Sequence, residues 1–225
     1  MMELAVSEVF YSIQGEGVTA GVPAVFVRLA GCNLKCSWCD TKHAWGSGRA
    51  VDVERLCSEA SNYLREHPEA HLVVTGGEPL MQQLALTELL KALKARFGDL
   101  YVEVETNDTL RPAEGLAEVV DQWNVSPKLS NSGVPRNRRV VREAIEWFAG
   151  APNAYFKFVV SCEEDVKEVF ELFPEVVSRA RGRVLLMPLS STREEYERVA
   201  PEVVRLSMKY GLRFSPRLQV ELGLR

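Results

Sequence analysis

Residues 24–41 read AVFVRLAGCNLKCSWCDT, an apolar run of strand composition that leads directly into a group of cysteines. The cysteines are Cys32, Cys36 and Cys39, spaced C-x3-C-x2-C, and no fourth cysteine lies nearby in the sequence. Three thiolates can hold a metal ion or an iron–sulfur cluster while one coordination position stays open. Because an open position admits a substrate or a cofactor, this stretch predicts a catalytic loop at the end of a strand.

Short strand patterns and longer helical patterns alternate along the rest of the chain. We predict strands at Ala24–Ala30, Leu72–Thr75, Tyr101–Glu105, Gln122–Val125, Tyr155–Val160 and Arg183–Met187. We predict helices at Val53–Glu66, Gln82–Arg96, Val140–Phe148, Glu163–Phe173 and Arg193–Tyr210, and a short one within Arg111–Val120. Repeated strand–helix units predict an α/β fold with a parallel sheet, here an open, partial βα barrel of about six strands with helices outside.

Composition limits the possible classes of protein. The chain has 225 residues and is 46% hydrophobic, with no linker or repeat, so we expect one domain over residues 1–225. No apolar run reaches membrane-spanning length, the acidic start Met1–Glu8 is unlike a signal peptide, and the net charge of −4 argues against nucleic-acid binding. The odd number of cysteines, five, favours a reducing, cytoplasmic location. Cys57 and Cys162 are interpreted as small hydrophobic residues, and the basic stretch Pro135–Arg139 as an exposed loop.

Polar and glycine-rich segments follow the predicted strands. In parallel α/β folds the ligand lies at the carboxyl ends of the strands, so these segments form a list of candidate site positions. They are Gly31-Cys32, Thr75–Pro79, Thr106-Asn107, Ser126–Lys128, Ser161-Cys162 and Pro188-Leu189. The cysteine loop is one of them, which supports a catalytic role.

A structural zinc site is the first alternative for the cysteines. His43 could serve as a fourth ligand and complete a closed site of three cysteines and one histidine. Zinc motifs usually take two ligands from each of two separated pieces of chain, whereas these three thiols lie in one loop at a strand end. That difference favours an iron–sulfur cluster with one open iron, without removing zinc from consideration.

Two motifs together carry a family resemblance. The C-x3-C-x2-C loop with Trp38 before its last cysteine, and Gly76-Gly77-Glu78-Pro79 about forty residues later, resemble the radical S-adenosylmethionine (SAM) superfamily. The resemblance implies a [4Fe-4S] cluster on Cys32, Cys36 and Cys39, with SAM at the open iron. It implies that SAM contacts Trp38, Asp40, Gly76, Gly77, Glu78, Glu105, Ser126 and Lys128. Glycines at 76 and 77 suit that role, because backbone without side chains can approach a ligand closely.

Three further sequence segments narrow the resemblance to one family within the superfamily. Ser12-Ile13-Gln14-Gly15-Glu16-Gly17, Cys39-Asp40-Thr41 and Ser126-Pro127-Lys128 are similar to the 7-carboxy-7-deazaguanine synthase family, over essentially the whole chain. This implies a carbon–nitrogen lyase that contracts the ring of 6-carboxy-5,6,7,8-tetrahydropterin with loss of ammonia, in the biosynthesis of queuosine or archaeosine. The same resemblance implies a reductant protein such as flavodoxin or ferredoxin, and a homodimer.

The predicted substrate contacts are amide, carboxylate and guanidinium groups. They are Ile13, Gln14, Gly15, Glu16, Arg28, Thr75 and Gln219, and the resemblance adds Thr41 as a ligand of Mg²⁺. An arginine offers a planar fork to the substrate carboxylate, and amides and glutamates suit the polar edge of a pterin. The simpler interpretation of Arg28 is an ion pair with a neighbouring acid. Gln219 stands where many members of the family carry histidine, and the chain lacks their closing Trp-Gly.

Two alternatives remain at this point. One is another radical SAM enzyme, such as an activating enzyme that installs a glycyl radical on a partner protein. The other is a zinc-binding protein without catalysis.

Two glutamates, Glu103 and Glu105, share one face of a predicted strand, so we expect a polar barrel interior. We expect Lys157 to pair with one of them, because a buried lysine is rarely left without a partner.

Overall fold

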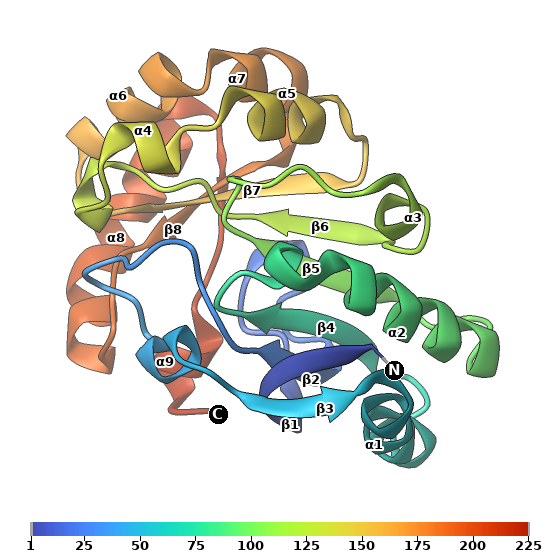
Figure 1. Cartoon of the computed structure of the whole chain (residues 1–225). Helices are drawn as coiled ribbons and strands as arrows, with labels where there is room; N and C mark the ends of the chain where they lie inside the picture. Colours follow the sequence, from blue (N-terminus) through green and yellow to red (C-terminus); the bar gives the residue numbers. More distant parts are fainter. Residues whose placement is uncertain (1, 225) are drawn as a thin grey trace.

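A computed structural model describes residues 2–224 of the chain. Within these residues, nine strands form one sheet in the order β3-β1-β2-β4-β5-β6-β7-β8-β9 (Figure 1). The strands are β1 (Glu3–Ile13), β2 (Pro23–Leu29), β3 (Arg49–Asp52), β4 (His71–Gly76), β5 (Val102–Thr106), β6 (Gln122–Val125), β7 (Ala154–Val160), β8 (Val184–Pro188) and β9 (Arg213–Phe214). The pairs from β2 to β9 are parallel, whereas β1 is antiparallel to both β2 and β3. This confirms an open, partial βα barrel.

Helices follow most parallel strands and cover the outside of the sheet (Figure 1). They are α1 (Val53–Glu66), α2 (Gln83–Arg96), α3 (Glu114–Ala117), α4 (Arg136–Arg139), α5 (Arg142–Gly150), α6 (Glu163–Leu172), α7 (Pro174–Ala180), α8 (Arg193–Tyr210) and α9 (Leu218–Leu222). Short 3-10 turns lie at Gly17–Thr19, Lys42–Trp45, Pro79–Gln82, Ser130–Ser132 and Arg181–Arg183. No helix within residues 2–224 is long and apolar enough to cross a membrane.

Local sequence explains where the longer helices begin and end. Asp52 caps α1 by accepting a hydrogen bond from the Arg55 amide at 2.9 Å. Thr192 caps α8 in the same way, accepting from the Glu195 amide at 3.2 Å. Gly211 ends α8 with a φ of 63°, the left-handed conformation in which glycine has no steric penalty. These two helices were predicted at the residues where the structure places them.

Several elements differ from the sequence-based prediction. Strands β1, β3 and β9 and helices α7 and α9 were not predicted, and the helix predicted within Arg111–Val120 is only the single turn α3. β1 was missed because its residues do not alternate regularly between buried and exposed, and its pairing with β2 shifts register between Val6 and Glu8. The stretch Pro135–Arg139 was predicted to be an exposed loop. Residues 135–138 are exposed, which is confirmed, but the loop assignment was wrong. The stretch contains α4, and Arg139 is 5% exposed because it pairs with Glu168 at 2.8 Å.

Polar side chains fill the interior of the barrel below the carboxyl ends of the strands. Glu103 is fully buried and accepts hydrogen bonds from Thr19, Gln122 and Asn124 at 2.7–3.2 Å, with His71 at 2.8 Å. The predicted polar interior is therefore present. Every buried oxygen of this carboxylate has partners, which is the condition for a stable polar network.

Candidate active site

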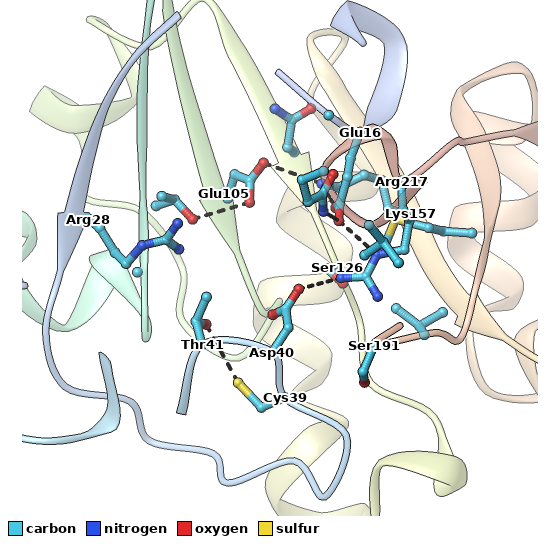
Figure 2. Close-up of a pocket in the computed structure, with 18 of the residues that line it drawn as sticks. Glu16, Arg28, Cys39, Asp40, Thr41, Glu105, Ser126, Lys157, Ser191 and Arg217 are labelled. Atoms are coloured by element: carbon cyan, nitrogen blue, oxygen red, sulfur yellow. Dashed lines mark hydrogen bonds and ion pairs between the residues drawn. The ribbon is translucent and has the colours of Figure 1, made fainter. Parts of the chain in front are cut away.

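A cavity of about 730 Å³ opens at the carboxyl ends of the parallel strands. That volume lies in the range of about 300–1,000 Å³ that holds a cofactor or a drug-sized ligand. Its wall includes all the residues predicted for the site except Glu78. Figure 2 shows Arg28 on one side, Glu16, Lys157 and Arg217 on the other, and Glu105 between them.

The three cysteines of the loop after β2 all line this cavity. Burial raises the pKa of the Cys32 and Cys36 thiols above the ordinary value. Among residues 2–224, no three His, Cys, Asp or Glu side chains converge closely enough to hold a single metal ion. In an iron–sulfur cluster each thiolate binds a different iron, whereas a single zinc ion takes all of its ligands itself.

His43 and Cys57 make their contacts outside the group of three cysteines. His43 Nε2 lies 3.4 Å from a carboxylate oxygen of Glu8, and its side chain is 58% exposed. Cys57 is buried in α1 within the apolar core, as predicted. With His43 paired to Glu8, the three cysteines and His43 do not form the closed zinc site considered from the sequence.

Gly76 and Gly77 lie at the end of β4 and pack against the end of β2 and the beginning of the cysteine loop. The Gly77 amide donates to the Leu29 carbonyl at 3.1 Å, and the Glu78 amide donates to the Gly31 carbonyl at 2.8 Å. A Cβ at Gly77 would lie 2.1 Å from the Gly31 carbonyl oxygen. The two glycines were expected to let backbone approach a ligand. In the structure they also let two loops of the site approach each other.

Glu78 is fully buried and is absent from the cavity wall. Its carboxylate accepts hydrogen bonds from the Leu80 amide at 3.0 Å, the Thr106 hydroxyl at 2.9 Å and the Asn107 amide at 2.7 Å. Burial raises its pKa despite these donors. The side chain thus fixes the end of β5 against the turn after β4, while its contact with SAM stays a prediction.

A buried ion network holds Glu16, which comes from the loop after β1. Lys157 Nζ on β7 lies 2.9 Å from Glu16 and 3.3 Å from Glu105. Arg217 Nε lies 3.1 Å from the other oxygen of Glu16, and Arg217 also pairs with Asp40. Lys157 was predicted to pair with Glu103 or Glu105, and the pair with Glu105 is confirmed.

The network fixes the charge states of its members. Burial works to raise the pKa of Glu16, but the charges of Lys157 and Arg217 outweigh it and hold this pKa well below its usual range. Burial likewise works to lower the pKa of Lys157, and Glu105 and Glu16 outweigh it, so this pKa is raised. Glu16 therefore enters the cavity as an ionised carboxylate beside two cations.

Amide and hydroxyl side chains donate hydrogen bonds to Glu16 and Glu105 in the cavity wall. Gln14 donates to Glu105 at 3.3 Å, Thr75 donates to Glu105 at 3.2 Å, and Gln219 donates to Glu16 at 2.6 Å. The carbonyl oxygen of the Gln219 side chain is buried and has no hydrogen-bond partner among the described residues. A Cβ at Gly15 would lie 2.0 Å from that oxygen, so glycine is what leaves room for it.

Arg28 makes the ion pair that the simpler interpretation from the sequence predicted, and its contact with a substrate stays a prediction. Its Nε donates to Glu8 at 2.8 Å, and its guanidinium lies 5.4 Å from the centre of the Phe10 ring. Its side chain also lines the cavity and is 15% exposed. The ion pair orients the guanidinium and leaves its remaining N–H groups for a ligand.

The residues predicted for SAM and Mg²⁺ lie near the cysteines. Lys128 Nζ donates to the Ser126 hydroxyl at 2.7 Å and lies 5.5 Å from the centre of the Trp38 ring. Thr41 Oγ1 lies 3.6 Å from Cys39 Sγ (Figure 2). Asp40 and Ile13 line the same cavity. Their individual ligand contacts stay predictions.

Arg217 is the main site residue that sequence reasoning missed. It is 6% exposed, and its guanidinium reaches Glu16, Asp40 and the carbonyl of Ser190. The segment around it was recognised only for Gln219. An arginine beside a proline near the end of a chain gives no periodic signal, so only its buried contacts identify it.

The comparisons with known proteins agree with this site. The family model described as the radical SAM superfamily matches residues 27–197. The 7-carboxy-7-deazaguanine synthase of Pyrobaculum aerophilum is 43% identical over 96% of this chain and 92% of the relative. The one from Hyperthermus butylicus is 37% identical over 98% and 93%. The crystal structure of QueE from Escherichia coli has a TM-score of 0.72 and 26% identity, covering 96% of this chain and 94% of that one.

An open βα barrel with three cysteines at the mouth of its cavity is the arrangement of the radical SAM superfamily, and this chain belongs to it. It is therefore an enzyme that uses a [4Fe-4S] cluster and SAM. Within the superfamily, identity over nearly the full length places the chain in the 7-carboxy-7-deazaguanine synthase family. The alternatives of a glycyl-radical activating enzyme and of a zinc-binding protein are not supported.

Asp108, in the loop after β5, carries the first prediction. It is fully buried, both carboxylate oxygens lack a hydrogen-bond partner among the described residues, and its φ is 68°. Burial and the nearby Glu78 raise its pKa well above the usual value. The native state therefore keeps a proton that the unfolded state releases above about pH 4, so stability falls as the pH rises from there.

Asp108→Gly is expected to stabilise the protein by about 1–3 kcal/mol at pH 7, because glycine tolerates the positive φ and removes the unpaired acid. The gain should grow between pH 5 and pH 8 and should be smaller below that window. Urea unfolding across this range measures it. Asp99→Gly, at an exposed loop position, is the control. A loss of stability in Asp108→Gly at every pH would show that the carboxyl group has an unrecognised native partner.

Proposed function

We propose that this protein converts 6-carboxy-5,6,7,8-tetrahydropterin into 7-carboxy-7-deazaguanine with loss of ammonia. The observation that carries the proposal is the composition of the cavity wall opposite the cysteines. It presents an oriented guanidinium, an ionised Glu16 and two amide side chains. A carboxylated pterin has the complementary groups, namely a carboxylate, amino groups and a lactam.

Each side chain has a role that follows from its chemistry. Arg28 offers N–H donors to the substrate carboxylate, because Glu8 already holds its Nε. Glu16 accepts from substrate amino groups, and Gln219 holds the Glu16 carboxylate in place by donating to it. Gln14 and Thr75 are held by Glu105 and offer their other polar atoms to the ring.

The cofactor side of the cavity is built around the cysteines. When bound, the cluster and SAM supply a carbon-centred radical that removes a hydrogen from the substrate and starts the ring contraction. Lys128 provides a positive charge for the SAM carboxylate, oriented by Ser126 and by the ring of Trp38. The protein binds and orients the two ligands and excludes water from between them.

Magnesium belongs to the proposal through Thr41. Its hydroxyl lies at the cavity wall next to Cys39, between the cysteine loop and the pterin side. Mg²⁺ prefers oxygen ligands and keeps several waters, so one hydroxyl together with substrate oxygens would suffice. The chemistry of the Thr41 donor fits, and the role itself rests on the family resemblance.

The remaining features of the proposal concern the setting of the enzyme. We expect a single domain over residues 1–225, supported by the one continuous sheet and its main apolar core. We also expect a homodimer in the cytoplasm, with flavodoxin or ferredoxin as the source of electrons. The family resemblance supports the last three features.

Anaerobic reconstitution tests the proposed function. The protein, loaded with iron and sulfide, is incubated with the carboxy-pterin, SAM, Mg²⁺ and dithionite, and the products are identified by mass spectrometry. The proposal requires 7-carboxy-7-deazaguanine and ammonia in equal amounts. Cleavage of SAM without any deazapurine would keep the superfamily assignment and contradict the substrate.

Arg28→Ala is expected to raise KM for the carboxy-pterin by about 30- to 100-fold, since a charge-assisted contact worth about 2–3 kcal/mol is lost. The KM for SAM should stay unchanged. Arg49→Ala is the matched control, because Arg49 pairs with Glu59 at 2.7 Å on the exposed edge strand β3. Unchanged steady-state kinetics of the Arg28 variant with the pterin would rule out the carboxylate contact.

A further inference from the structure

Arg217 is a charged residue of the cavity wall to which the proposed function gives no role. It is 6% exposed, and burying a guanidinium is costly unless its N–H groups are paired. Its Nε donates to Glu16 at 3.1 Å, and the two terminal nitrogens donate to the Asp40 carboxylate and to the Ser190 carbonyl. Each nitrogen of the guanidinium therefore contacts a different segment of the chain.

Two of these segments belong to different functional halves of the cavity. Glu16 lies in the loop after β1, which carries proposed contacts to the pterin. Asp40 lies in the cysteine loop, between Cys39 and Thr41, the proposed ligands of the cluster and of Mg²⁺. The guanidinium of Arg217 lies between Asp40 and Glu16 (Figure 2). It joins the cofactor side of the cavity directly to the substrate side.

A guanidinium fixes the relative positions of the groups that it binds. It is planar and its donors point in set directions, so the carboxylates of Glu16 and Asp40 cannot shift independently while both stay bonded to it. The carbonyl of Ser190, in the loop after β8, holds the third nitrogen. The ammonium of a lysine, in contrast, is a point charge on a flexible stem. Arg217 therefore holds the cysteine loop at a set distance from the loop after β1.

The backbone on both sides of Arg217 is held by other hydrogen bonds. The Gly17 amide donates to the Ser215 hydroxyl at 2.8 Å, and the Leu218 amide donates to the Gly15 carbonyl at 3.0 Å. These bonds attach the C-terminal segment to the loop after β1 without the help of the Arg217 side chain. The separate contribution of that side chain is the link to the cysteine loop.

The proposed reaction depends on the distance between the two ligands. In the productive step one C–H bond of the pterin breaks, and the same hydrogen atom forms a C–H bond at the radical carbon on the cofactor side. Reacting atoms need to lie about 3–3.5 Å apart, and a displacement of about 1 Å can cost about 100-fold in rate. A radical that meets no substrate hydrogen takes one from another C–H or S–H group, and SAM is then spent without product.

We propose that Arg217 is a positioning residue that sets the distance between the cofactor side and the substrate side of the cavity, and so couples the cleavage of SAM to formation of the deazapurine. This role rests on the proposed function and deepens it. Arg217 acts through the two carboxylates that it joins, Glu16 and Asp40. Its loss should change the fate of the radical more than it changes the binding of either ligand.

Two variants separate the charge of the side chain from its shape. Arg217→Lys keeps a positive charge beside Glu16 but loses the planar fork, whereas Arg217→Met removes both and keeps an apolar stem. Arg183→Met is the matched control, because Arg183 joins chain segments at the amino ends of β7 and β8, outside the cavity wall. Its guanidinium donates to the carbonyls of Ala151 and Ala154 at 2.5 and 2.6 Å.

Reconstituted proteins are incubated anaerobically with the carboxy-pterin, SAM, Mg²⁺ and dithionite, and 5′-deoxyadenosine and deazapurine are both quantified. In both Arg217 variants the ratio of 5′-deoxyadenosine to deazapurine is expected to rise about tenfold or more, while kcat for the deazapurine falls about 100-fold. The KM for the pterin should change less than about threefold, because Glu16 keeps its bonds to Lys157 and Gln219. The control variant should keep the wild-type ratio.

Two measurements that do not depend on turnover complete the test. They are the iron and sulfide content after reconstitution, and the affinity for the carboxy-pterin by isothermal titration calorimetry with SAM present and no reductant. Both should stay close to the wild-type values in the Arg217 variants. A loss of iron, or a loss of pterin affinity as large as the loss of kcat, would overturn the positioning role.

The lysine variant gives the sharpest contradiction. A wild-type ratio of 5′-deoxyadenosine to deazapurine in Arg217→Lys would show that positive charge alone suffices, and would overturn the proposal. Failure of the proposed function gives a different result, because the wild type itself would then cleave SAM without forming any deazapurine.

Discussion

Lys157→Met is expected to lower the free energy of unfolding by about 3–5 kcal/mol at pH 7, the range found when one partner of a buried ion pair is removed. Lys157 is 2% exposed and lies between two carboxylates, Glu16 at 2.9 Å and Glu105 at 3.3 Å. Methionine has a similar length, so the apolar stem still packs. The cost arises because buried negative charge loses its nearest cation.

The pH dependence of this cost has a definite sign. In the wild type the pKa of Glu16 is lower in the folded protein than in the unfolded chain. Its stabilising contribution is therefore present above the ordinary glutamate pKa of about 4.3 and is lost as the pH falls below it. Without Lys157 that contribution shrinks, so the difference between variant and wild type should narrow as the pH falls toward 4.

Urea unfolding under anaerobic conditions at pH 7 and at about pH 4 measures the effect. Lys94→Met is the control, because Lys94 pairs with Asp121 at 2.6 Å but its side chain is 26% exposed. Partly exposed pairs contribute about 0–1 kcal/mol. An equal loss of stability in the two variants would show that the buried ion pairs of Lys157 contribute no more than an exposed pair.

Gly76→Ala is expected to destabilise the protein by about 2–5 kcal/mol and to impair loading of the cluster. The added Cβ would lie 2.0 Å from the Leu29 carbonyl oxygen and 2.6 Å from the Leu29 amide nitrogen. Both obstacles are backbone atoms of the paired strand β2, which cannot rotate away. A φ of 137° adds strain, because residues with a side chain rarely adopt it.

Two measurements separate stability from assembly of the site. Urea unfolding gives the first, and the iron and sulfide content after reconstitution gives the second. Gly98→Ala is the matched control, because no atom lies within 4 Å of its added Cβ. A Gly76→Ala variant with wild-type stability and full iron content would contradict the close packing of Gly76 against Leu29, at the end of β2 before the cysteine loop.

The sequence predicted the parallel part of the fold and most of the site for physical reasons. Buried parallel strands are short apolar runs, and the helices between them carry caps and apolar stripes, as in α1 and α8. The cysteines and the Gly-Gly-Glu-Pro segment follow strands directly, so the topology alone brings them to one edge. The antiparallel strands β1 and β3 lack such a pattern, because part of each stays exposed.

The remaining site features depend on contacts between distant segments, which no local pattern records. The hydrogen bonds that the Glu78 carboxylate accepts from Thr106 and Asn107, for example, join the turn after β4 to the end of β5. Arg217 acquires its role only because the last part of the chain returns to the loop after β1. Its partner Glu16 lies 201 positions earlier in the sequence.

That separation bears on how the enzyme matures during synthesis. The cysteine loop and β4 leave the ribosome early, but the wall formed by Glu16, Arg217 and Gln219 exists only after residue 219 has been made. A nascent chain therefore exposes its cysteines before the cavity has closed around them. Gly223 and Leu224 also line the cavity, so this part of the wall forms later still.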